Sequence, residues 1–245
     1  MHQTQTRRLA TSVFRAPLVL CAAVIAAVLA AAGSVALPAA GAASAPACVA
    51  EASMPSRVAL GARPVVLQVT LRGSSACRGV TTDNGGSATL DGPGGSTSNY
   101  PLRWSRLGAR DTAHFQLGLT KLGTYRISGG DLQTYDAEYM HIRYTWRSTS
   151  TNVKYVGRFA GVSRSGGAVR ATLQYYTNSG WRSHSGVAVE LQRRSSNSWH
   201  AIAHMRSSSS GRVAFRAGSG QYRLVSASST YVWTANHLVG SAAGA

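Results

Sequence analysis

The segment Val187-Ala-Val-Glu-Leu-Gln-Arg-Arg194 decides the fold class of this 245-residue chain. Its apolar and polar residues alternate from Val187 to Leu191. A period of two is typical of a strand that is buried on one face. Two similar runs follow after glycine- and serine-rich turns, at 209–215 and 220–224. No stretch of a dozen residues beyond residue 42 has a helical period, so the sequence predicts an all-β protein.

The same alternation occurs in both halves of the chain, at 65–71, 115–119, 140–146, 169–175 and 213–215. Short strands separated by turns indicate β-sandwiches, and about 200 residues suffice for two sandwiches of about 100 residues each. An internal repeat supports a duplication: Gly123-Thr-Tyr-Arg-Ile127 reappears 97 residues later as Gly220-Gln-Tyr-Arg-Leu224. Trp104 and Trp199 precede the two copies at similar offsets.

We expect the domain boundary in the polar run Arg147–Asn152. The predicted organisation is a signal peptide at 1–42, one sandwich at 48–147, a second at 153–240 and a flexible tail at 241–245.

The second half, from Val153 to Leu238, resembles an immunoglobulin-like β-sandwich of secreted proteins from high-GC Gram-positive bacteria. The residues that carry the resemblance are 187–194, Trp199, 209–215 and 220–224. The first half resembles, more loosely, the partner domain that often precedes it. The resemblance implies two tandem immunoglobulin-like sandwiches of an accessory or surface type. It implies no common activity and no site residues.

The N-terminal segment has the three-part layout of a secretory signal peptide. A basic stretch ends at Arg15, an apolar stretch runs over 16–36, and an Ala-x-Ala step ends at Ala42, after which we expect cleavage. An uncleaved membrane anchor and a lipidated Cys48 are the alternatives. The favoured interpretation predicts a secreted protein, extracellular or associated with the cell wall, without a transmembrane segment after cleavage.

Two cysteines, Cys48 and Cys77, remain once the signal peptide with Cys21 is removed. A single pair in an exported chain indicates a disulfide. The bond would close a loop of about 30 residues and stabilise the fold by roughly 3 kcal/mol. It would connect the mature N-terminus to the end of the first long strand.

The charge is strongly positive and uneven. The chain has 25 Lys and Arg against 8 Asp and Glu, a net charge of +17 at pH 7. Residues 48–151 hold 11 basic and 7 acidic residues, whereas 152–245 hold 11 basic and 1 acidic. A positive surface attracts polyanions, although scattered arginines also serve solubility alone. By strand parity Arg170, Arg212, Arg216 and Arg223 point outward, and Arg193 and Arg194 end a strand. These six arginines are the candidate polyanion-binding residues.

Aromatic residues suggest a second kind of contact. Tyr176 and Trp181 flank a turn in the second half. Exposed aromatic rings can stack on sugars or bases, so both residues are candidates for ligand stacking. No motif that reads nucleic-acid sequence is present.

No catalytic or metal-binding motif is convincing. His200 and His204 share a face of the expected strand but would lie about 13 Å apart, too far for one zinc ion. The acidic cluster Asp131, Asp136 and Glu138, close to His141, is best interpreted as a polar loop. We therefore expect no catalytic residue, no metal and no cofactor.

The sequence predicts a secreted, non-enzymatic binding or structural protein at the cell wall or in the extracellular matrix. Its partner would be a cell-wall polyanion or another extracellular ligand, bound by the basic second sandwich. The alternatives are a carbohydrate-binding accessory module that uses Tyr176 and Trp181, and a secreted hydrolase with an unrecognised active site.

Overall fold

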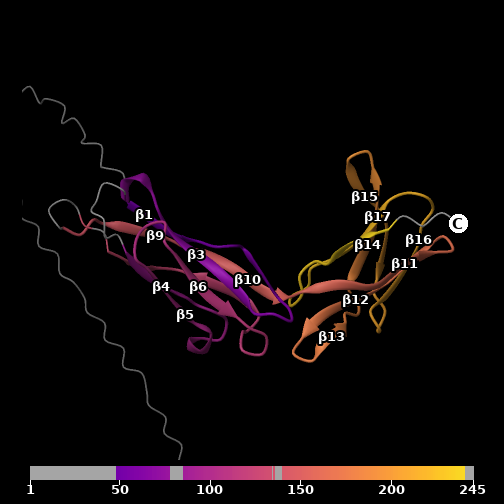
Figure 1. Cartoon of the computed structure of the whole chain (residues 1–245), viewed down its shortest axis with the longest axis horizontal. Helices are drawn as coiled ribbons and strands as arrows, with labels where there is room; N and C mark the ends of the chain where they lie inside the picture. Colours follow the sequence, from indigo (N-terminus) through magenta and orange to yellow (C-terminus); the bar gives the residue numbers. More distant parts are fainter. Residues whose placement is uncertain (1–47, 78–84, 134, 136–139, 241–245) are drawn as a thin grey trace, which may run out of the picture. The chain divides into compact units, whose positions relative to one another are not determined.

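The computed structural model describes residues 48–77, 85–133, 135 and 140–240. The expected signal peptide at 1–42 and the expected tail at 241–245 lie outside these residues. Within the described part, the helical elements are two short 3₁₀ turns, η1 (Ser75–Cys77) and η2 (Ser96–Ser98). None of the described helices has the length and apolar character to cross a membrane. The all-β prediction is confirmed (Figure 1).

The first sandwich contains the strands up to Tyr155. These are β1 (Cys48–Ser53), β2 (Arg57–Leu60), β3 (Val65–Gly73), β4 (Gly86–Leu90), β5 (Tyr100–Trp104), β6 (Arg110–Phe115), β7 (Gly123–Ile127), β8 (Gly130–Leu132), β9 (Tyr144–Arg147) and β10 (Thr149–Tyr155). The strand orders are β6-β3-β1-β9, β2-β10-β7 and β5-β4-β8.

In the first sandwich the chain changes sheets between β1 and β2 and again between β9 and β10. β1 pairs parallel with β9 in one sheet, and β2 pairs parallel with β10 in another. The first and last segments of the sandwich therefore run side by side through both layers. Strands that switch sheets at a bend in this way form the corners of a sandwich.

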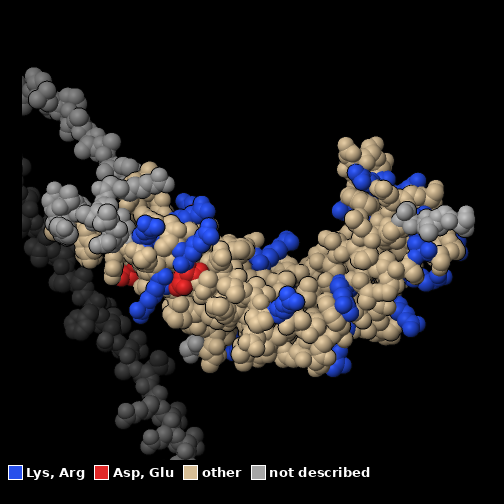
Figure 2. All heavy atoms as spheres, viewed as in Figure 1, with Lys and Arg blue, Asp and Glu red and all other residues tan. Residues whose placement is uncertain are grey.

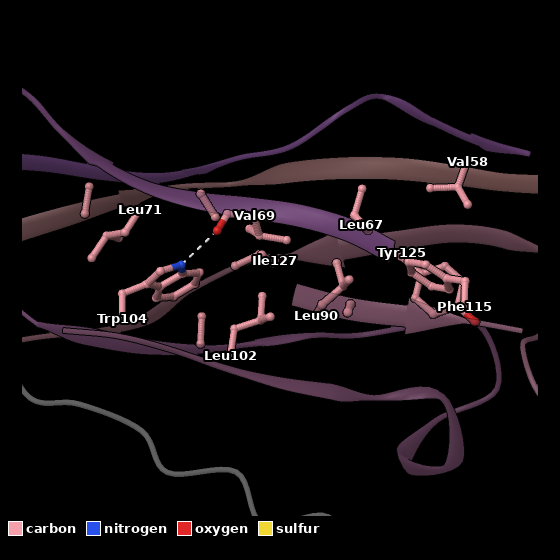
Figure 3. Close-up of a cluster of buried hydrophobic side chains, with 14 of the residues drawn as sticks. Val58, Leu67, Val69, Leu71, Leu90, Leu102, Trp104, Phe115, Tyr125 and Ile127 are labelled. Carbon is pink, nitrogen blue, oxygen red and sulfur yellow. Dashed lines mark hydrogen bonds between the residues drawn. The ribbon is translucent and has the colours of Figure 1, made fainter. Parts of the chain in front are cut away.

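The first core lies between these sheets (Figure 3). Leu67, Val69 and Leu71 on β3 are buried, as the alternation at 65–71 predicts. The indole of Trp104 is also buried, and its Nε1 donates a hydrogen bond of 3.0 Å to the carbonyl oxygen of Val69. This bond satisfies the one polar group of the side chain, which would otherwise be costly to bury.

The second sandwich has two sheets around a separate core. Its strands are β11 (Gly157–Ser165), β12 (Ala168–Thr177), β13 (Gly180–Ser183), β14 (Ala188–Ser195), β15 (Ser198–Arg206), β16 (Arg212–Arg216), β17 (Tyr222–Ser226) and β18 (Asn236–Val239). In one sheet, β12 pairs with β11, β13 and β16, and the other sheet has the order β15-β14-β17-β18. The chain crosses between the sheets after β13, β15 and β16, which is an immunoglobulin-like arrangement.

The structure corrects the expected position of the linker between the two sandwiches. The polar run Arg147–Asn152 lies in β9 and β10, and β10 pairs with both β2 and β7. Val153 is fully buried in the first core, and the second core begins with Phe159. The polar side chains misled the prediction because an alternating strand keeps one face in solvent.

The ends of two expected strands are also corrected. Leu119 is 75% exposed and Met140 is 65% exposed, although both were expected on inner faces. β6 already ends at Phe115, where Gln116 accepts backbone hydrogen bonds from Leu119 and Thr120 to form a turn.

The internal repeat marks an equivalent corner in each sandwich. The Tyr125 hydroxyl donates to the carbonyl oxygen of Lys121 at 3.0 Å, and the Tyr222 hydroxyl donates to that of Ser219 at 3.1 Å. This is the tyrosine corner of immunoglobulin-like sandwiches. Gly123 and Gly220, at the start of the two copies, both have φ of 131°, a region that favours glycine.

Because Tyr125 in the tyrosine corner of the first sandwich is buried, we expect the first sandwich to lose stability at alkaline pH. Burial, with a smaller effect of nearby Tyr100, raises the pKa of Tyr125 from 10.0 to about 12. Above about pH 10 the unfolded chain loses this proton while the folded chain keeps it. The free energy of unfolding should therefore fall between about pH 10 and about pH 12.

Urea unfolding followed by tryptophan fluorescence across this pH range measures the effect. The Tyr125→Phe variant should lose about 1 kcal/mol at neutral pH, from the missing hydrogen bond. It should then show a shallower alkaline decline than the wild type. Tyr231→Phe, at a side chain 61% exposed, is the matched control. An identical alkaline decline in wild type and Tyr125→Phe would contradict the assignment.

The predicted disulfide is present between Cys48 on β1 and Cys77 in η1, with Cα atoms 4.7 Å apart. The two cysteines are 29 residues apart in sequence, and both are buried. The bond joins the start of the first described strand to the segment that follows β3, as expected.

Candidate anion-binding faces of the second sandwich

The outer face of the sheet of β11, β12, β13 and β16 carries a row of arginines. Val169, Ala171 and Leu173 on β12 point into the core, so the residues between them point outward. Arg170 is paired with Ala214 on β16, which places Arg212 and Arg216 on the same outer face, two residues to either side. All three arginine side chains are exposed.

Arg212 and Arg216 are available to a ligand. Within the described part of the chain, neither side chain has a hydrogen bond or an ion pair. Arg170 has one weak contact, in which Nη1 donates to Ser165 Oγ at 3.4 Å. Along β16, Arg212 and Arg216 lie about 13 Å apart at ~3.3 Å per residue, and Arg170 lies between them on the next strand. Such a row can follow an extended anionic chain.

Tyr176 and Trp181 lie on this same outer face, where β12 pairs with β13. Their rings meet edge to face, with centroids 5.1 Å apart. The guanidinium of Arg158 on β11 lies 3.7 Å from the Trp181 ring centroid and donates through Nε to Gln174 Oε1 at 3.0 Å. The sequence reasoning missed Arg158. Its alternation with buried Phe159 was the signal that could have identified it as outward-facing.

The outer face of the sheet β15-β14-β17-β18 carries two of the other predicted arginines, Arg194 and Arg223. Arg223 on β17 pairs with Gln192, and Arg194 on β14 pairs with Trp199 on β15. The Arg223 guanidinium lies 4.8 Å from the Trp199 ring centroid, and its Nε donates to Gln192 Oε1 at 2.7 Å. Arg194 Nη1 donates to Gln221 Oε1 at 3.3 Å.

These side chains line a groove of about 630 Å³. Arg194, Trp199 and Arg223 form its basic and aromatic part, and the β18 residues His237 and Leu238 belong to its other side. Leu238 is 68% exposed and is paired with Arg223 in the register of β17 and β18. The groove therefore places an apolar wall beside two guanidinium groups.

Arg193 belongs to neither face. In the register it lies opposite Tyr222, whose side chain is buried, and opposite His200 at the exposed end of the sheet. The six predicted arginines thus separate into three on one outer face, two on the other and Arg193 between them. The alternation along a strand shows that a residue points outward, but it does not show to which of the two sheets the strand belongs.

The histidine pair His200 and His204 does not share a face, contrary to the sequence analysis. β15 is a strand, but its register shifts between the partners Leu191 and Gln192. This bulge adds one residue, so His204 is opposite outward-facing Glu190 while His200 has the opposite orientation. Among the described residues, no three His, Cys, Asp or Glu side chains are grouped as metal ligands.

The acidic cluster is described only in part, since Asp136 and Glu138 lie outside the described residues. Asp131 is exposed on β8, where the Tyr144 hydroxyl donates to its Oδ1 at 3.5 Å. His141 lies against Tyr135, with ring centroids 4.4 Å apart.

In the first sandwich, unlike on the arginine-bearing faces of the second, an arginine is paired with a carboxylate. Its hollow of about 780 Å³ contains Arg147 and Glu51, which form an ion pair of 3.3 Å. In the second sandwich the one carboxylate is Glu190, and it accepts from Gln192 Nε2 at 2.7 Å. On the face that Figure 2 shows, Asp and Glu lie over the first sandwich, while Lys and Arg are spread over both.

No protein-family model and no curated protein sequence matches the chain. Among solved structures, it is similar to Escherichia coli alpha-2-macroglobulin spanning domains MG0-NIE-MG1, with 12% identity and a TM-score of 0.29. That match covers 80% of this chain and 65% of the other, just under two thirds.

Two further solved structures are similar to the chain. Chicken CNTN1 FN1-FN3 domains match with 10% identity and a TM-score of 0.30, over 79% of this chain and 68% of the other. A tetra-tandem repeat of a large adhesion protein matches with 11% identity and a TM-score of 0.27, over 79% and 50%. At such values it is the strand order of the chain itself that establishes two immunoglobulin-like β-sandwiches.

Proposed function

We propose that this chain is a secreted, non-enzymatic binding protein of the cell wall or extracellular matrix, and that its second sandwich binds an anionic polymer. The observation that carries the proposal is the row of exposed Arg170, Arg212 and Arg216, which faces solvent without a carboxylate partner. Guanidinium groups bind phosphate, sulfate and carboxylate groups with paired hydrogen bonds.

The geometry favours a polymer over a compact anion. The three arginines are spread along two neighbouring strands instead of converging on one point. Each would neutralise a separate charge of an extended chain, with release of the counterions that the chain carries. Binding of this kind depends on the charge of the polymer and is weakened strongly by salt.

The aromatic pair adds contacts to the same face. Arg158 covers one side of the Trp181 indole, so this side is not free for a sugar ring. We therefore assign Trp181 the role of supporting Arg158, with Tyr176 at its edge. This arrangement favours a charged polymer over the neutral polysaccharide that a carbohydrate-binding module would take.

Retention of the purified protein on washed bacterial cell walls across a salt titration tests the proposal. We expect strong retention at low ionic strength and progressive release as salt rises. Walls from which the anionic polymers have been extracted by acid are the matched control, and they should retain far less protein. Equal retention on both kinds of wall, or none at low salt, would contradict the proposal.

A further inference from the structure

Both outer faces of the second sandwich contain the same three-residue arrangement. On one face Arg158 lies against Trp181 at 3.7 Å and donates through Nε to Gln174 at 3.0 Å. We call these residues the Arg158 group. On the other face the Arg223 group has Arg223 against Trp199 at 4.8 Å, with Nε bonded to Gln192 at 2.7 Å.

The arrangement fixes an arginine without neutralising it. A glutamine oxygen accepts the Nε hydrogen and carries no net charge, unlike the carboxylate that usually fixes an arginine. The indole supports the guanidinium plane by a cation–π contact. In both groups the two terminal nitrogens make no hydrogen bond to any residue that the structure describes, so both remain available for a phosphate or carboxylate. An arginine held in place loses less conformational entropy when it binds.

The Arg223 group has further features of a binding site. It lies in the groove of about 630 Å³, a volume typical of ligand sites. Arg194 lines the same groove, so two guanidinium groups face one ligand. Glu190 is the acidic residue on this face, and it is engaged by Gln192 at 2.7 Å and by His204 at 3.7 Å.

The two groups lie on opposite sides of the sandwich. Leu173 from one sheet and Leu191 from the other belong to the same core, so the outward faces of the two sheets point away from each other. Packed sheets lie about 10 Å apart, and the side chains on both outer faces add to that thickness. A short anion bound at one group cannot reach the other.

We infer that the second sandwich is bivalent and bridges two anionic polymer chains, one bound at each outer face. The inference rests on the proposed function and adds the Arg223 group as a second site for the same class of ligand. A protein with one binding face would coat a polymer, whereas a protein with two opposed faces joins polymers into a network. Bridging raises the overall strength of attachment because several weak contacts act together.

Calorimetric titration with a short-chain polyphosphate, at low salt, measures the number of sites. The full mature chain should bind two equivalents. Arg158→Gln combined with Arg170→Gln, Arg212→Gln and Arg216→Gln should reduce the number to about one, because it removes the guanidinium groups of one outer face. Arg223→Gln should do the same by removing the central cation of the other face. Trp199→Ala provides an independent variant of the second group, and near-ultraviolet circular dichroism verifies that each variant is folded.

Light scattering with long-chain polyphosphate then measures bridging. Wild type should increase the particle size at intermediate protein-to-polymer ratios and less so at excess protein, where every polymer chain is saturated. Both of these variants, each with one face left, should bind the polymer without this increase. Arg63→Gln, at an exposed arginine of the first sandwich, should behave as the wild type does.

The outcomes separate the two proposals. No binding of polyphosphate by the wild type would overturn the proposed function and the bridging together. One equivalent in the wild type, with Arg223→Gln unchanged, would overturn the bridging alone. Two equivalents without growth in particle size would also overturn it, because one polymer chain would then occupy both faces.

Discussion

In an Arg223→Gln background, which removes the site on the other outer face, replacing Arg170, Arg212 and Arg216 together with glutamine should lower the affinity for an anionic polymer about a hundredfold at low salt. Each guanidinium that contacts a charged group is taken to contribute about 1 kcal/mol, and about 1.4 kcal/mol corresponds to a factor of ten. The fold should be unaffected, because the three side chains are exposed and make at most one weak hydrogen bond.

The salt dependence of the same variant gives a second measurement. Each lost phosphate contact reduces the slope of log affinity against log salt by about 0.7 to 0.9, so the triple variant should lose about 2 to 3 units of slope. Fluorescence anisotropy with a labelled polymer measures both quantities. The matched control is Arg63, Arg106 and Arg110 changed to glutamine, which removes the same charge from exposed positions of the first sandwich.

The control distinguishes a binding face from net charge. If both triple variants lose the same affinity, the overall charge of the protein governs binding and the β12–β16 face is not a site. If only the variant of the second sandwich loses affinity and slope, the row of arginines is the site.

Removing the disulfide should destabilise the first sandwich by about 3 kcal/mol. The bond closes a loop across a sequence separation of 29 residues, and its absence frees the unfolded chain. For a domain of about 100 residues, such a loss corresponds to a fall in Tm of about 10 to 20 °C. The double variant Cys48→Ala and Cys77→Ala avoids a lone thiol.

Differential scanning calorimetry of the double variant tests this effect. The two sandwiches have separate cores, so we expect the transition of the first sandwich to move and the transition of the second to stay. Polymer binding by the variant should also be unchanged, since the arginine faces belong to the second sandwich. An unchanged first transition would show that the loop is held by β1 and β3 pairing without the bond.

The alternation of apolar residues was sufficient to predict the strand class and most inward-facing residues. Val189, Leu191 and Leu224 lie in the core as predicted, because a half-buried strand must turn every second side chain toward it. The same rule failed at Leu119, because the strand already ends at Phe115 and a turn follows. Trp199 resembles Trp104 in sequence position, yet it lies on an outer face whereas Trp104 is buried.

The candidate site was predicted only in part. The alternation along each strand identified the arginines that point outward. Which side chains contact one another depends on how the strands pair. Arg158 and Gln174 are 16 residues apart, and Arg223 and Gln192 are 31 apart. No local pattern signals such contacts, since they depend on the register between strands. The bulge that separates His200 from His204 was hidden for the same reason.

The bulge in β15 has a consequence for contacts between copies of the chain. β15 is the terminal strand of its sheet, and its central residue Ile202 is 49% exposed. An unpaired sheet edge can pair with the edge of another molecule, and crowding of many copies along one polymer favours such pairing. The extra residue interrupts the row of backbone donors and acceptors and keeps two copies from aligning over the whole strand.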